Sequence, residues 1–337
     1  MGTITTMTIR KTMTTKPVAP PGGSPCAVEL RTPDISPYRH GNTGVDYITT
    51  FASGKPGPHV MVNAITHGNE ICGALAVVRL FESGVRPTRG KLSLSFANVD
   101  AFHRFDRRHP HASRFVDEDF NRVWTPAILD GSRCSVELTR ARAMRPIIDQ
   151  VDFLLDIHSM HDPHDAVMIS GPLDKGIELS KRLGVPEFIV ADVGHANGTR
   201  MRDYGGFGDP QSPKSALLVE CGQHWQRASE RLAWQTVWRF LRVLEVVDDE
   251  RAAAQLDRAA PPAQKVVRVT DALIATTLDY KFADGLKGLS IVPRKGDLIA
   301  SDAGEPVVAP YDNCVLIMPT LVHVKPGLTA VRIGRLE

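Results

Sequence analysis

The stretch His59–Phe81 reads HVMVNAITHGNEICGALAVVRLF and contains a strand, a turn and a helix in one run. Its first residues are a run of mixed apolar character, which predicts a buried strand. From Ile71 onward apolar residues recur at helical spacing until Gly84 ends the segment. His67 and Glu70 lie three residues apart where the strand gives way to the helix. Side chains at this separation on a helical turn project side by side, close enough to share one cation.

The same turn has a simpler interpretation. Thr66 or Asn69 could cap the helix, while Glu70 complements the positive N-terminal end of its dipole and His67 is an incidental polar residue. Pairs of the form H-x-x-E arise easily by chance, so the turn alone does not establish a metal site.

Strands and helices alternate along the rest of the first 248 residues. This alternation predicts an α/β fold with a mixed open sheet and helices on both faces. Further apolar runs predict strands, and periodic segments predict helices. The predicted strands are 91–99, 152–158, 166–171, 187–193 and 215–222, and the predicted helices are 135–151, 174–184 and 230–247.

The character of the chain changes after this region. Residues 249–264 are rich in Ala and Pro and short of bulky apolar groups, which indicates a linker. Residues 265–337 contain short strands with turn signals between them, which predicts a small all-β domain. At the other end, residues 1–27 hold many Thr and little that could bury surface. We expect a disordered tail there, with an organellar presequence as the alternative, preceding a main domain of residues 28–248.

The overall charge excludes several classes of partner. The 337 residues include 40 basic and 38 acidic side chains, for a net charge of +2. This balance gives no support for a nucleic-acid or membrane-surface partner, and no apolar run is long enough to span a bilayer. Five cysteines are widely and irregularly spaced, with no CxxC pair. They indicate free thiols in a reducing compartment, and hence a cytoplasmic protein.

Two further polar groups end buried strands. His158 follows the apolar run DFLLDI, and Glu220 follows SALLV. Ligands in open α/β sheets bind outside the carboxyl ends of the strands, so His158 can join His67 and Glu70 in a site with three protein ligands. Asp156 could orient the imidazole of His158, or it could be a polar group of the core. Glu220 could act as a general base, or it could be a surface carboxylate.

Two more histidines, His161 and His164, follow at steps of three residues and are rival ligands or solvated loop residues. The segment RFVDEDFNRVW, residues 114–124, is rich in arginine. Arg122 with Asn121 offers several donors to an anionic group, and Arg114 could stabilise a developing oxyanion. The alternative is a charged surface loop with internal Arg–Asp pairs.

The order of these motifs is more specific than any one of them. H-G-N-E, R-x-x-x-x-D-x-N-R, D-I-H and V-E-x-G follow one another along roughly residues 55–245. This series resembles the aspartoacylase and succinylglutamate desuccinylase family, a branch of the zinc carboxypeptidase-like hydrolases. The trailing β region also suits that family. One departure is Phe120, where the family usually has leucine.

The resemblance implies a set of roles. His67, Glu70 and His158 would hold one Zn²⁺ per chain, and Glu220 would be the base that acts on a metal-activated water. Asn121 and Arg122 would hold the carboxylate of the substrate, and Arg114 would polarise the scissile carbonyl. The implied activity is hydrolysis of the amide bond of an N-acyl amino acid. Family members often self-associate, so a homo-oligomer is expected.

The choice of substrate is left open. Residues 195–213 are expected to form the wall of the acyl or side-chain pocket, with Arg200, Arg202 and Tyr204 as candidates for a second anion contact. Solvated loop residues are the alternative for all three. Two other functions remain: a metallocarboxypeptidase that acts on short peptides, and a zinc- or ligand-binding homologue without catalysis.

Overall fold

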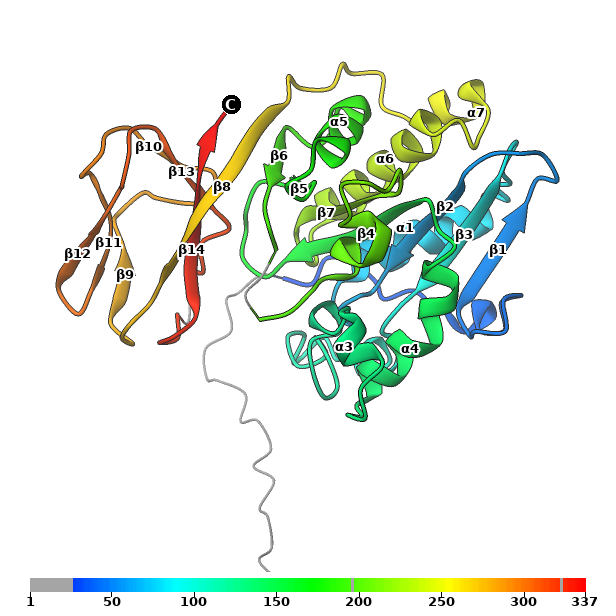
Figure 1. Cartoon of the computed structure of the whole chain (residues 1–337), viewed down its shortest axis with the longest axis horizontal. Helices are drawn as coiled ribbons and strands as arrows, with labels where there is room; N and C mark the ends of the chain where they lie inside the picture. The colour runs from blue at the N-terminus through cyan, green and yellow to red at the C-terminus, as the bar shows by residue number, and fades with distance from the viewer. Residues whose placement is uncertain (1–26, 195–196, 322–323) are drawn as a thin grey trace, which may run out of the picture.

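A mixed sheet of eleven strands runs through the molecule in the order β1-β3-β2-β4-β7-β5-β6-β8-β14-β13-β10 (Figure 1). The computed structural model describes residues 27–194, 197–321 and 324–337. A second, three-stranded sheet has the order β12-β11-β9. The strands are β1 (Ile48–Ala52), β2 (His59–Ala64), β3 (Lys91–Phe96), β4 (Phe153–Met160), β5 (Val167–Ile169), β6 (Phe188–Ala191), β7 (Ser215–Gln223), β8 (Lys265–Ile274), β9 (Tyr280–Phe282), β10 (Ile291–Val292), β11 (Leu298–Asp302), β12 (Glu305–Val308), β13 (Cys314–Ile317) and β14 (Thr329–Leu336).

Helices cover both faces of the first part of the sheet (Figure 1). Alternate side chains of β2 enter two different apolar clusters: Val60 and Val62 pack with α1 and α6, and Met61 packs with α4. This alternation is what a strand with both faces buried requires. The helices are α1 (Ile71–Glu82), α2 (Val99–Phe102), α3 (Pro126–Leu129), α4 (Val136–Ile148), α5 (Asp174–Leu183), α6 (Arg227–Val243) and α7 (Asp249–Ala253).

The central strands β3, β2, β4 and β7 are parallel, so their carboxyl ends meet at one edge of the sheet. In the register of β4 and β7, His158 lies opposite Glu220. The pairing of β4 with β7 therefore places His158 beside Glu220. The turn after β2 ends at the same edge.

The β region at the end of the chain continues the main sheet. β8 pairs in parallel with β6, and β14, β13 and β10 follow in antiparallel order. The predicted fold class is confirmed: a mixed α/β sheet with helices on both faces, followed by an antiparallel β region. The segment 249–264 contains the short helix α7 before β8 begins. The boundaries of the two regions as separate domains stay a prediction.

Some predictions concern parts that the structure describes only in part. The expected disordered tail, 1–27, lies outside the described residues except for Ala27. Four cysteines lie inside the described ranges and all are free thiols, namely Cys72, Cys134, Cys221 and Cys314. None of the helices in the described ranges has the length and apolarity that a membrane crossing requires.

Candidate metal and catalytic site

The turn between β2 and α1 is held close to the neighbouring backbone. The backbone of Gly68 packs closely against the backbone of α2, since a Cβ atom at this position would lie 2.3 Å from the carbonyl carbon of Ala101. The side chain of Thr66 donates to Asp156 and so does not cap the helix. Glu70 occupies the N-cap position without a side-chain capping bond. The turn thus leaves the carboxylate of Glu70 free to face the sheet edge.

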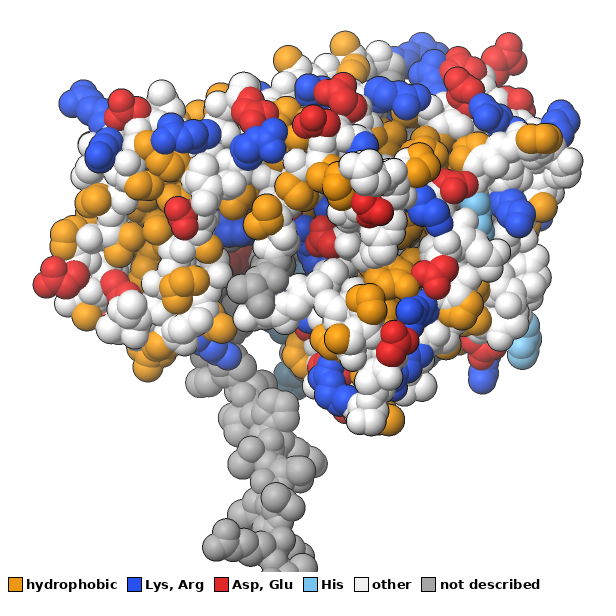
Figure 2. All heavy atoms as spheres, in the orientation of Figure 1, with side chains coloured by type: hydrophobic (Ala, Val, Ile, Leu, Met, Phe, Trp, Pro, Cys, Tyr) orange, Lys and Arg blue, Asp and Glu red, His pale blue; other side chains and the backbone are white. Residues whose placement is uncertain are grey.

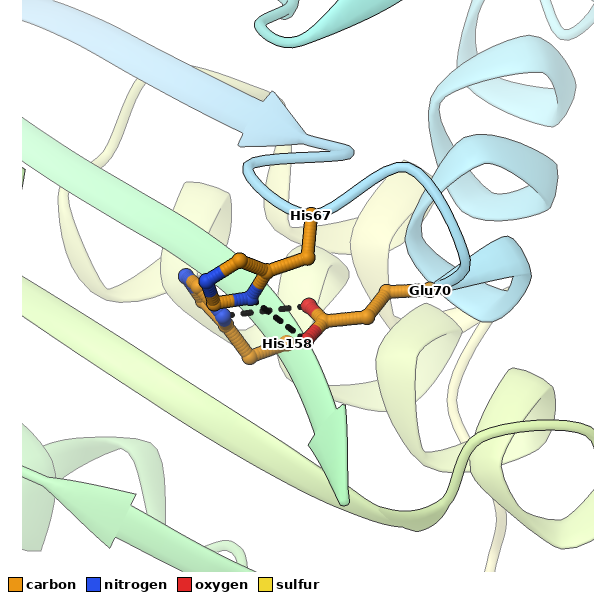
Figure 3. Close-up of side chains that lie close together, drawn as sticks. All are labelled: His67, Glu70 and His158. Atoms are coloured by element: carbon orange, nitrogen blue, oxygen red, sulfur yellow. Dashed lines mark hydrogen bonds and ion pairs between the residues drawn. The ribbon is translucent and has the colours of Figure 1, made fainter. Parts of the chain in front are cut away.

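Three side chains converge beyond this turn (Figure 3). Glu70 Oε1 lies 2.7 Å from His67 Nδ1, and Glu70 Oε2 lies 3.0 Å from His158 Nδ1. All three side chains are buried, and one potential ligand atom from each lies within 4.8 Å of the others. Two imidazoles and one carboxylate are a ligand set that zinc prefers in catalytic sites.

The second nitrogen of each imidazole is bound by another carboxylate. His67 Nε2 lies 3.0 Å from Asp119 Oδ1, and His158 Nε2 lies 2.8 Å from Asp156 Oδ2. In the tautomer with its hydrogen on Nε2, each imidazole donates to an aspartate, and its Nδ1 atom beside Glu70 is then available to a cation. Metal-ligating histidines usually have this arrangement. The residues present fit a divalent cation.

The electrostatics of the cluster also favour a bound cation. Burial alone would raise the pKa of Glu70, but His158 and His67 outweigh it and hold that pKa well below its usual value. Burial alone would lower the pKa of His158, but Asp156 and Glu70 outweigh it and raise that pKa well above its usual value. The carboxylates of Asp156 and Glu70 that stabilise a proton on this imidazole would also stabilise a cation that takes the place of that proton.

Glu220 lies next to these ligands on β7. Its side chain lines the same cavity, and its Oε2 atom is buried with no hydrogen-bond partner among the described residues. Burial and the nearby Glu70 raise the pKa of Glu220 to about 7, although His158, His67 and Arg114 oppose the rise. A carboxyl group with this pKa can both accept and release a proton near neutral pH.

The clamp is our name for the residues predicted to hold the substrate, namely Arg114, Asn121 and Arg122. They lie in a loop and in the short 3-10 helix that follows it, Phe120–Arg122. Arg114 Nη2 donates to Asp119 Oδ2 over 3.2 Å and lies 2.9 Å from His67 Nε2. Asn121 is buried, and its side-chain oxygen accepts from the backbone N–H of Met201. Asp119 also accepts from the backbone N–H of Asn121, so this aspartate connects the clamp to the metal ligands.

A cavity of about 480 Å³ lies over the cluster. Eight of the ten residues predicted from the sequence line it: His67, Glu70, Arg114, Asn121, Arg122, His158, Arg200 and Glu220. Its lining also includes Met318, Thr329 and Arg332, which come from the β region. The rivals His161 and His164 also line the cavity, but His161 pairs with Asp162 and His164 with the carbonyl of Pro319.

Arg200 reaches the cavity with its charge already compensated. It forms a two-bond pair with Asp192, at 2.7 and 3.0 Å, and it also donates to Asp203. Arg332 on β14 pairs with the same Asp192. Although burial opposes the effect, the guanidinium groups hold the pKa of Asp192 down at about 2.

The structure does not bring Arg202 and Tyr204 to the cavity. Arg202 is buried and donates to the carbonyl oxygens of Ser170 and Ala216, each over 2.8 Å. Tyr204 belongs to an apolar cluster with α4, and its hydroxyl donates to Asp149. Both side chains therefore organise the loop that carries Arg200, and we do not assign them to the substrate pocket.

The chain is similar in sequence and in fold to known proteins. Residues 56–232, more than half of the chain, match the family described as succinylglutamate desuccinylase/aspartoacylase catalytic domain. The chain belongs to this family. The resemblance inferred from the motifs is thereby confirmed. No protein with a curated description matches the sequence.

Solved structures of the succinylglutamate desuccinylase/aspartoacylase family share the fold. A family member from Rhodobacter sphaeroides is 14% identical with a TM-score of 0.63, covering 87% of this chain and 90% of its own. Succinylglutamate desuccinylase from Vibrio cholerae is 16% identical with a TM-score of 0.60, covering 86% of each chain. The product-bound ectoine utilization protein EutE (DoeB) from Ruegeria pomeroyi is 14% identical with a TM-score of 0.60, covering 88% and 92%.

Sequence reasoning missed two residues of the site in this family member. Asp119 is the aspartate of the R-x-x-x-x-D-x-N-R motif, but the sequence alone indicates for it only an ion pair with a neighbouring arginine. Arg332 lies in the strand sequence AVRIGRL, where nothing signals a distant cavity. Only the pairing of β14 with β8 brings it to the site.

Proposed function

We propose that the protein is a zinc-dependent amidohydrolase with one Zn²⁺ per chain, which splits an N-acyl amino acid into a carboxylate and a free amino acid. The observation that carries the proposal is the cluster of His67, Glu70 and His158 beside Glu220, whose pKa is raised to about 7. Membership of a family of succinylglutamate desuccinylases and aspartoacylases supports the reaction class.

Proton transfer is assigned to Glu220. Zn²⁺ bound by the three ligands would supply Lewis-acid chemistry, polarising the carbonyl and acidifying water. Glu220 takes a proton from the attacking water and later delivers it to the leaving amine, because its raised pKa makes both directions accessible. Its unpaired Oε2 atom is the acceptor for this transfer.

Substrate orientation is assigned to the clamp. The oxygen of Asn121 is held by Met201, which leaves its NH₂ group as a donor. Together with the guanidinium of Arg122 it grips the α-carboxylate and fixes the amide over the metal ligands. Arg114, close to His67, stabilises the oxyanion that develops on the scissile carbonyl.

The far side of the cavity is assigned to the rest of the substrate. Arg200 contributes a compensated charge there, since Asp192 and Asp203 occupy most of its donors. Arg332 shares Asp192, and its other side-chain hydrogen bond among the described residues is to the sulfur of Met318. It therefore keeps donors for a polar substrate group. The cavity volume of about 480 Å³ suits a small molecule.

The test combines metal analysis with activity. Purified protein is expected to contain about one zinc per chain and to hydrolyse members of a panel of N-acetyl, N-succinyl and N-aroyl amino acids. Glu220→Gln should keep the zinc and lose turnover by about 10²–10⁴-fold, the usual contribution of a general base. The matched control is Glu230→Gln, which changes a partly exposed carboxylate paired with Arg79. Near-normal turnover in Glu220→Gln would contradict the mechanism.

Tripeptides assayed beside this panel separate the alternative functions. Tripeptides cleaved faster than N-acyl amino acids would favour a metallocarboxypeptidase. Zinc without any hydrolysis would favour a binding protein. We also propose that the protein is a cytoplasmic homo-oligomer. Light scattering on the purified protein tests the oligomeric state.

A further inference from the structure

A buried carboxylate outside the cavity binds the backbone of the clamp loop. Glu137, in the first turn of α4, is fully buried. Its oxygens accept from three consecutive backbone N–H groups, those of Val116 at 2.6 Å, Asp117 at 3.0 Å and Glu118 at 3.3 Å. The side chain of Asn98 donates a fourth bond over 3.1 Å.

The three bound amides lie between the two ends of the clamp. Arg114 precedes them and Asp119 follows them directly, ahead of Asn121 and Arg122. No strand or helix is assigned between Arg114 and Asp119, so no regular ladder of backbone bonds fixes this part of the loop. A single carboxylate supplies the acceptors instead.

The loop and the start of α4 are joined at other points as well. Asp117 accepts from the backbone N–H of Val136 over 2.7 Å, and Glu118 accepts from the hydroxyl of Ser135 over 2.5 Å. These contacts lie at the surface or near it, whereas Glu137 lies in the interior. An ionised carboxylate is costly to bury unless it is fully hydrogen-bonded, so the four donors and Glu137 depend on each other.

We propose that Glu137 is a positioning residue for hydrolysis. By gathering the amides of Val116, Asp117 and Glu118, it fixes the distance between Arg114, which faces the carbonyl, and Asn121 with Arg122, which face the α-carboxylate. The inference rests on the proposed function for the roles of those three side chains. The loop geometry itself can be tested without activity.

The first experiment is hydrogen exchange on the zinc-loaded protein. In the wild type, the amides of residues 116–118 should exchange slowly for a loop without regular structure. Glu137→Gln, which keeps the size of the side chain but removes its charge, should accelerate exchange in residues 114–122. Unprotected amides in the wild type, or unchanged exchange in Glu137→Gln, would overturn the proposal whether or not the protein hydrolyses any substrate.

A matched control is present in the β region. Asp302 is 7% exposed and also accepts four bonds, from the N–H and hydroxyl groups of Thr276 and Thr277. Asp302→Asn removes a comparable set of charge-assisted bonds far along the chain from the clamp. It should loosen its own loop and leave exchange in residues 114–122 unchanged. Equal loosening of residues 114–122 by both variants would mean a general loss of stability and would overturn the specific role.

The second experiment uses the preference for a carboxylate. Wild-type protein should strongly prefer an N-acyl amino acid to the matching N-acyl amine, which lacks the α-carboxylate. Glu137→Gln should lower kcat/KM for the amino acid by roughly 10–100-fold, mainly through KM, with unchanged zinc content. The preference for the carboxylate should fall by about the same factor, because kcat/KM for the amine depends less on the clamp. Equal losses for both substrates would contradict a positioning role.

Discussion

At the scale of single residues, the site is defined by which nitrogen of each histidine is bound. The Nε2 atoms of His67 and His158 lie within hydrogen-bond distance of Asp119 and Asp156, and the two Nδ1 atoms face Glu70. The sequence motifs predicted the three ligands and raised Asp156 as a candidate partner. They could not predict the role of Asp119, because its contact with His67 joins residues 52 positions apart.

The protonation of Glu220 leads to a prediction on pH dependence. A base must be ionised, so kcat/KM should rise with pH through the pKa of Glu220 and level off above it. Burial raises this pKa to about 7, and a bound dication would lower it, so the inflection should fall at or below pH 7.

Rates of a good N-acyl amino acid substrate, measured between pH 5 and pH 9, check this expectation. The residual activity of Glu220→Gln should lack the acidic limb. A flat wild-type profile over the whole range would show that no base with such a pKa limits the reaction.

At the scale of elements, local patterns predicted most strands and helices. Ser135 begins the predicted helix 135–151 and caps α4, accepting from the N–H of Leu138 over 2.9 Å, and Leu138, Ala141, Met144 and Ile148 of that helix are buried. The loop 195–213 was less predictable. Arg202 is buried there because backbone carbonyls of β7 and of the residue after β5 accept its donors, and these partners are distant in sequence.

The turn between β2 and α1 carries a prediction about Gly68. A Cβ atom there would lie 2.5 Å from both the nitrogen of Phe102 and the carbonyl oxygen of Ser113, distances that real Cβ atoms do not reach. Gly68→Ala should therefore displace the turn and with it His67. We expect zinc affinity to fall by at least about tenfold, a typical effect of misplacing a ligand.

Competition with a fluorescent chelator measures this affinity. Gly285→Ala is the control, because Gly285 has a φ of +79° but open space around it. The control should cost some stability and leave zinc binding intact. Normal zinc affinity in Gly68→Ala would mean that the turn tolerates the displacement.

At the scale of the whole molecule, the sheet passes without a break from the α/β region into the β region. The change in composition after residue 264 predicted the β region, but no sequence feature indicated that its strands would pair with the main sheet. The contact of β8 with β6 pairs Phe188–Ala191 with residues 265–268, two segments far apart in the sequence. An apolar cluster that includes Val190, Val267 and Val315 lies across this junction.

A substitution at the junction tests whether the two regions unfold together. Val267→Asp places an unpaired charge in the buried cluster and should lower Tm by roughly 10 °C. All four tryptophans lie between residues 124 and 238, so their fluorescence reports only on the α/β region. We expect this signal to shift with Val267→Asp although the change is in β8.

Val308→Asp is the matched control, because Val308 is 41% exposed on the small sheet. Val308→Asp should leave the unfolding temperature measured by tryptophan fluorescence unchanged. An unchanged transition in Val267→Asp as well would show that the β region unfolds independently of the other.

In the space-filling view the β region, at the left, adjoins the α/β region in the upper part of the molecule (Figure 2). Arg332 and Thr329, which line the cavity, belong to β14, which follows all the candidate metal ligands along the chain. A ribosome-bound chain therefore contains His67, Glu70 and His158 long before it contains Thr329 and Arg332. Because these three residues all come before the β region, the candidate metal cluster can assemble in a nascent chain before the lining of the cavity is complete.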